Sequence, residues 1–263
     1  MVNDDFEQDP VEALAAELPE PTFKTEPAVA AAEETEKIGG FAFFLSLFML
    51  LPTALLLMAV CLTAIRPIDY QALAVFGGAC VFGVLLGQSA IRGHLSVLIH
   101  ESKHAVVSNL VGNKRKGMKI DEGSGYFTYT YTKRTAHLNF LISLAPYILP
   151  VFTFVGTLAS LALFRNDHTL AVLLVGLCYG TDAILNVRDI SPIQTDISTI
   201  RGGYGMGIAY IFAWNLAIFA VLLTWVFNGS EGLMDLLKLA TEAFMRFYSL
   251  LSPSAAPLAG SGS

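Results

Sequence analysis

Two histidines four residues apart stand beside a glutamate in an otherwise apolar stretch, and these side chains could bind and use a metal ion. The stretch is SVLIHESKHAVVSNLVG, residues 96–112, and it contains His100, Glu101 and His104. On a helix, side chains four residues apart lie on one face, so both imidazoles can bind the same zinc ion. Glu101 would lie about 60° around the helix from His104, close enough to polarise a metal-bound water without being a ligand.

A short pattern of this kind can arise by chance, so its surroundings matter. His100, Glu101, Lys103 and His104 are four ionisable groups within five residues of an apolar run. Ionisable groups are costly at membrane depth, so their concentration favours a functional site. Three roles are open for Lys103: it could extend to the membrane face, stabilise an oxyanion or mark a catalytically inactive relative. We expect the first of these.

The composition predicts an integral membrane protein. Of the 263 residues, 54% are hydrophobic and 14% are charged, and the mean hydropathy is +0.58. Soluble domains usually have about a quarter of their residues charged. The net charge of −6 arises in residues 1–39, which hold eleven acidic and two basic side chains, whereas the remainder has a net charge of +3. We predict that residues 1–39 form a disordered acidic tail.

Six apolar runs are long enough to cross a bilayer, which takes about 20 helical residues. They are Phe41–Ile65, Gln71–Ile91, His94–Gly112, His137–Phe164, Thr169–Val187 and Tyr204–Phe227. The third run would contain the histidines, and Pro146 and Pro150 are expected to bend the fourth. The predicted fold is therefore an all-α membrane domain over residues 40–227, with about six transmembrane helices.

Between the third and fourth runs the pattern changes from helical to alternating. Phe127, Tyr129 and Tyr131 would face one way and the intervening threonines the other, which predicts a strand. With residues 118–120 and the turn-prone residues 122–125, it would form a small β-hairpin after the histidine helix. The hairpin could be a structural flap at the membrane interface or a sheet edge that holds an extended substrate, with Tyr129 and Tyr131 in contact with that substrate.

The sequence after the last apolar run predicts an amphipathic helix followed by a flexible tail. Residues 228–252 place Asp235, Lys238, Glu242 and Arg246 on one stripe, which is typical of an amphipathic helix on a membrane surface or against a partner. Residues 253–263 are predicted to be a flexible tail.

Loop charges predict the orientation of the spans. If six spans alternate, the basic residues at Arg66, at 114–134 and at 188–201 share one side. By the positive-inside rule that side is cytoplasmic, which places the hairpin inside and both termini outside.

Three aspartates, Asp182, Asp189 and Asp196, compete to complete the metal site. Asp182 would lie within a helix, with little freedom to reach across to the histidines. Asp189 directly follows Arg188, which could satisfy it as a surface ion pair. Asp196 follows Pro192, which disfavours helix just before it, so the chain there can fold back to the metal. We predict Asp196 as the third ligand, with Asp189 as the alternative.

The run HESKHAVVSNLVGNKRKGMKI followed by GSGYFTYTY resembles the HExxH helix and hairpin of the site-2 protease family, particularly its M50B-like branch. Members of that family are intramembrane zinc metalloproteases in which two histidines and a distant aspartate hold the metal. The resemblance implies that His100 and His104 are zinc ligands and that Glu101 is the catalytic base. It covers roughly residues 94–215.

The aspartate segment of the family has the order Asn…Pro…Asp-Gly, and Asn186, Pro192 and Asp196 follow that order. The resemblance implies that Asp196 is the distant ligand and makes Asn186 a candidate for substrate contact. Ile197 stands where the family has glycine, and the spacing differs from the usual one.

Together these features predict an intramembrane zinc metallopeptidase that cleaves membrane-embedded proteins. We expect it in the bacterial cytoplasmic membrane with its site toward the cytoplasm, with a protein substrate and the lipid bilayer as partners and no nucleic acid. The alternatives are a catalytically inactive relative that binds clients, or a small transporter or scaffold with a polar intramembrane site. The lack of an internal repeat counts against the transporter.

Overall fold

The computed structural model describes residues 41–66, 68–121, 124–200 and 202–251. The predicted acidic tail and the predicted flexible end lie outside these residues. The described elements are α3 (Phe41–Ile65), α4 (Tyr70–Ala90), α5 (His94–Leu110), β1 (Lys114–Asp121), β2 (Ser124–Thr130), η1 (Ala136–Leu138), α6 (Asn139–Ile148), α7 (Val151–Leu163), α8 (His168–Arg188), α9 (Thr195–Ser198) and α10 (Gly203–Leu251).

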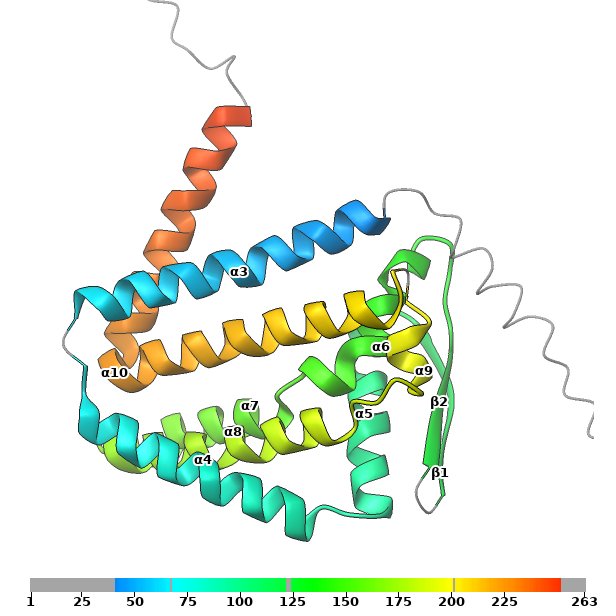
Figure 1. The fold of residues 1–263 in the computed structure, drawn as a ribbon, viewed down its shortest axis with the longest axis horizontal. Coiled ribbons are helices and arrows are strands. Elements are labelled where there is room, and N and C mark those ends of the chain that lie inside the picture. The colour runs from blue at the N-terminus through cyan, green and yellow to red at the C-terminus, as the bar shows by residue number, and fades with distance from the viewer. Residues whose placement is uncertain (1–40, 67, 122–123, 201, 252–263) are drawn as a thin grey trace, which may run out of the picture. The chain divides into compact units, whose positions relative to one another are not determined.

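Among the described helices, α3, α4, α8 and α10 are long and apolar enough to cross a membrane, and the bent pair α6–α7 could form a fifth span. These helices are those of an integral membrane protein, but the predicted count of six spans is not confirmed. The expected third span is α5, which has 17 residues and includes three histidines, a glutamate and a lysine. It runs across the direction of α3, α4, α8 and α10, at one end of these helices (Figure 1).

This arrangement changes which connections lie at the same end of the long helices as the hairpin. The six-span prediction places Arg66 on the same side as the hairpin. In the structure, the ends of α4 and α8 and the beginnings of α3 and α10 lie near α5 and the hairpin, whereas the connection at Arg66 lies at the opposite end (Figure 1). The beginning of α3 therefore lies at the same end of these helices as the hairpin (Figure 1).

The bend predicted in the fourth apolar run is confirmed. The helix pair on either side of Leu149 is bent by 68°. Leu149 has an extended backbone (ψ 111°), because the ring of Pro150 disfavours the helical conformation at the residue before it. Pro150 is then the N-cap residue of α7. The bend separates α6, which packs against α5, from α7, which packs against α8.

The predicted hairpin is also confirmed. β1 and β2 pair antiparallel, with Met118 opposite Phe127 and Lys119 opposite Tyr126. Both strands pack against α5. The rings of Phe127 and Tyr129 stack on one face of β2 with centroids 5.7 Å apart. The hairpin is therefore a wall beside the histidine helix.

The last helix is interrupted. Gly229 has a left-handed, non-helical conformation (φ 58°, ψ −147°), and α10 changes direction there (Figure 1). The part after Gly229 corresponds to the sequence predicted to be amphipathic, and its Phe244 and Phe247 side chains are exposed. Arg66 forms an ion pair with Asp235 near the start of this part.

Glycines set the distance between α4 and α8. A Cβ atom on Gly180 would collide with the carbonyl oxygen of Cys80, and one on Gly83 would collide with the carbonyl oxygen of Leu177. The two backbones therefore approach closely, as small residues allow in membrane helices.

We expect Gly180→Ala to lower the free energy of unfolding by about 1–3 kcal/mol, because the methyl group must push α8 away from α4. Gly77→Ala is the control, since no atom lies within 4 Å of its Cβ position. It should leave stability unchanged or raise it by up to about 1 kcal/mol. The free energy of unfolding of both variants is measured in detergent by circular dichroism. Equal changes in the two variants would show that α4 and α8 are not in close contact at Gly180.

Candidate metal centre

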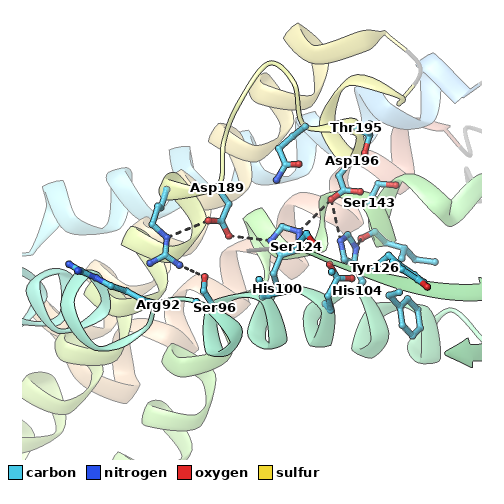
Figure 2. Close-up of a pocket in the computed structure, with 18 of the residues that line it drawn as sticks. Arg92, Ser96, His100, His104, Ser124, Tyr126, Ser143, Asp189, Thr195 and Asp196 are labelled. Atoms are coloured by element: carbon cyan, nitrogen blue, oxygen red, sulfur yellow. Dashed lines mark hydrogen bonds and ion pairs between the residues drawn. The ribbon is translucent and has the colours of Figure 1, made fainter. Parts of the chain in front are cut away.

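The two histidines of α5 face one cavity. His100 and His104 lie one turn apart, and their ring centroids are 5.2 Å apart. The cavity has a volume of about 730 Å³ and is lined by α5, by β2 and by the segment that links α8 to α10. Figure 2 shows both rings pointing toward the residues of this linking segment.

Asp196 lies above the two rings. Its Oδ2 atom is 3.4 Å from Nε2 of His100 and 3.3 Å from Nε2 of His104. Gln194 is extended (φ −70°, ψ 116°), and the single turn of α9 that follows aims Asp196 at α5. The structure thus brings together the three residues predicted as a ligand set.

The environment of Asp196 favours its charged form. Burial by itself raises the pKa of this carboxyl, but hydrogen bonds and attraction from the two imidazoles outweigh burial and hold the pKa of Asp196 well below its usual range. An ionised carboxylate is the form that binds a metal ion.

The second nitrogen of each ring is held by another group. His100 donates from Nδ1 to the Asp189 carboxylate at 3.2 Å, and His104 donates from Nδ1 to the carbonyl oxygen of Ile142 at 2.7 Å. A hydrogen bond at Nδ1 fixes the ring orientation and leaves the Nε2 lone pair for a metal. Asp189 therefore lies on the opposite edge of the His100 ring from Asp196, and it also contacts Arg188, as predicted, at 3.4 Å.

The donor set fits zinc. Among the described residues, His100, His104 and Asp196 form a group whose ligand atoms all lie within 4.8 Å of one another. Donors at the corners of a zinc tetrahedron with bonds of about 2.1 Å are about 3.4 Å apart. The separations of 3.3 and 3.4 Å from Asp196 to each ring match that value. Two imidazoles and one carboxylate are also the ligands of many catalytic zinc sites, which keep a fourth position open.

Glu101 lines the same cavity and is 6% exposed. β2 passes close to it at Gly125, where a Cβ atom would meet the Cγ atom of Glu101 at 3.0 Å and a methyl group of Val97 at 2.5 Å. A glycine at this place lets the hairpin close over the acid. The Gly-Ser-Gly stretch predicted only a turn, so its role beside Glu101 comes from the structure.

Of the three residues predicted to contact substrate, only Tyr129 lines the cavity. Burial raises the pKa of Tyr129 to about 12. Tyr131 packs on Tyr129, with ring centroids 6.2 Å apart, and is not among the lining residues. Asn186 is buried on the other side of α5, where Lys103 donates a hydrogen bond to it, and it does not line the cavity.

The expectation that Lys103 extends to the membrane face is wrong. Its side chain is 2% exposed and points into the protein, away from the cavity. Asp182, one of the three competing aspartates, lies near it and accepts hydrogen bonds from Thr153. Inside the protein, Asn186, the Pro146 carbonyl and the Asp182 carboxylate supply polar partners for the Lys103 ammonium.

Sequence reasoning also missed the carbonyl of Ile142. This group fixes the His104 ring, but no side-chain pattern marks a backbone acceptor that comes from a helix 38 residues further along the chain.

We expect Asp196→Ala to abolish high-affinity zinc binding, because it removes a donor from the set. Asp189→Asn should weaken zinc binding by about 10- to 100-fold, the usual effect of losing a partner that orients a ligand. Zinc affinity measured by competition with a chromophoric chelator gives both values. The reverse order of effects would make Asp189 the ligand.

Comparison with known families places these residues in context. The sequence profile of the family described as Peptidase M50B-like matches residues 89–246. The match includes α5, the hairpin and the α8–α10 link. It begins before and ends after residues 94–215, the region that resembles site-2 proteases. Neither the curated proteins nor the solved structures yielded a match. The profile covers more than half of the chain. The chain therefore belongs to the M50B-like peptidase family, as the resemblance to site-2 proteases predicted.

Proposed function

We propose that this protein is an intramembrane zinc metallopeptidase, similar to site-2 proteases, that hydrolyses peptide bonds of membrane-embedded proteins. The observation that carries the proposal is the convergence of His100, His104 and Asp196 on one point of a cavity that Glu101 also lines. Membership of a peptidase family and the apolar helices support it.

Each residue has a part in the proposed reaction. His100, His104 and Asp196 would hold the zinc ion, which supplies a Lewis acid for a peptide carbonyl and lowers the pKa of water. Glu101 is the general base: it takes a proton from the attacking water and returns it to the departing amine. Asp189 keeps the His100 ring in its orientation through Nδ1.

The hairpin is proposed to hold the substrate. Of the two roles open from the sequence, the position of β2 favours this one, because Tyr126, Phe127 and Tyr129 line the cavity along its length. A peptide must be extended for its scissile bond to reach the base, and a strand beside the metal can guide an extended segment. The aromatic side chains would contact the apolar residues of a membrane-embedded client.

The site is proposed to face the cytoplasm of a bacterial cell. Basic residues are concentrated at the end of the helices that holds α5 and the hairpin, and they include Lys114, Arg115, Lys116, Lys119, Lys133 and Arg134. The opposite end has Arg66 and Arg165 in its connections. By the positive-inside rule the richer end is cytoplasmic.

Zinc analysis together with Glu101→Gln tests this proposal. We expect one zinc ion per wild-type chain and cleavage of a membrane-embedded reporter in proteoliposomes. Glu101→Gln should retain the zinc and lower the cleavage rate by about 100-fold or more, because the base is lost while the ligands remain. Glu231→Gln, at a highly exposed glutamate near Arg66, is the matched control and should behave as wild type.

The outcomes separate the rival functions. Wild-type protein without zinc would refute the metallopeptidase and favour the scaffold or transporter. Zinc without cleavage of any membrane-embedded reporter would favour the inactive relative. Loss of zinc in Glu101→Gln would make Glu101 a ligand.

A further inference from the structure

A second polar cluster lies on another face of α5, and its side chains are not among those that line the cavity. Its centre is Lys103, next to His104 in the sequence, and its other charged member is Asp182 of α8, which is 1% exposed. Two charges this deep in a membrane protein are costly and are retained where they have a task.

Lys103 makes three contacts. Its Nζ atom donates to Oδ1 of Asn186 at 2.8 Å and to the carbonyl oxygen of Pro146 at 3.1 Å, and it lies 3.8 Å from Oδ1 of Asp182. The other carboxylate oxygen of Asp182 accepts hydrogen bonds from the backbone and hydroxyl of Thr153, at 2.7 and 2.8 Å. One lysine therefore connects α5, the last turn of α6, and α8.

The cluster extends to α10. Asn186 donates from Nδ2 to Oδ1 of Asn215 at 3.3 Å, and Asn215 donates to the carbonyl oxygen of Tyr147 at 2.8 Å. Each of these amides is thus engaged on both of its ends, which fixes its orientation. The cluster joins the helices on both sides of the segment that contains Asp196.

Because α5 and α8 pack little against each other, polar side chains such as Lys103 are what link them. α5 packs against α6 and the hairpin, whereas α8 packs chiefly against α4 and α7. Polar side chains join α5 to α8 and its C-cap at three places: Lys103 to Asp182 and Asn186 in the interior, and, at the cavity, His100 to Asp189 and Ser96 to Arg188. Because α8 leads directly into the segment with Asp196, the rotation of α5 against α8 decides whether the histidines meet that carboxylate.

We propose that Lys103 and Asp182 form a positioning pair, which sets the rotation of the metal-binding helix so that His100 and His104 face Asp196. The pair itself touches neither metal nor substrate. Stability alone does not explain its presence, because a well-packed apolar pair at a buried site is often as stable as a buried ion pair. What Lys103 adds is a directional hydrogen bond to Asn186 of α8, with the Asp182 carboxylate 3.8 Å away, at a place where α5 and α8 pack little against each other.

The distance between the two helices tests the proposal without any metal. After replacement of Cys61, Cys80 and Cys178, spin labels are placed on the exposed positions of Val106→Cys in α5 and Val187→Cys in α8. We expect Lys103→Met to broaden or shift the label-to-label distance distribution measured by pulsed electron paramagnetic resonance. Lys119→Met is the matched control, because it breaks an exposed pair with Asp121 on the hairpin and should leave the distribution unchanged.

Zinc affinity is the second readout, and this arm rests on the proposed function. Lys103→Met should weaken zinc binding by about tenfold or more, the effect expected when a ligand loses its support. The double variant Lys103→Met with Asp182→Asn leaves no uncompensated charge, so its unfolding midpoint should recover toward that of wild type while its zinc affinity stays low. A purely structural pair would instead restore both together.

The proposal is overturned if Lys103→Met is folded and keeps both the wild-type distance distribution and a zinc affinity within twofold of wild type. Recovery of zinc affinity along with stability in the double variant overturns it as well. Should Lys103→Met not fold, Asp182→Asn and the double variant give the same comparison. If wild-type protein binds no zinc, the proposed function fails, and the distance measurement alone decides this inference.

Discussion

Polar groups inside a membrane protein need partners from the same protein, and this requirement organises the candidate metal centre. Each histidine of the pair uses Nδ1 for a partner of its own: His100 has Asp189 and His104 has the carbonyl of Ile142. The remaining nitrogen of each ring is therefore directed at Asp196. The donor geometry is set by the protein, so a metal ion would not have to reorganise the rings when it binds.

The orientation of α5 determines where the chemistry can take place. A helix that lies across the ends of the spans presents its histidines to a cavity at one end of the bundle, where the hairpin forms a wall (Figure 1). Hydrolysis consumes water, and water reaches the end of a membrane bundle more readily than its middle. In the function we propose, a client segment would leave the bilayer at this end and extend beside β2.

α5 uses two of its faces for two different purposes. One face presents His100 and His104 to the cavity, and another directs Lys103 into a buried cluster on α8. The two faces are coupled because the chain that leaves α8 supplies both Asp189 and Asp196. A change in the interior cluster would therefore act on the metal site through helix rotation, without contact between the two.

The sequence alone determined the features that depend on local pattern. Four-residue spacing puts His100 and His104 on one face, alternation predicts β2, and apolar length predicts α3, α8 and the first part of α10. Pro192 predicts that the chain before Asp196 is not helical. Tertiary structure decided the rest. It showed that α5 runs across the direction of the long apolar helices, that Lys103 points inward, and that Asp189 holds His100 from the side opposite Asp196. The last two outcomes depend on partners 43 to 96 residues away in the chain, which no local periodicity encodes.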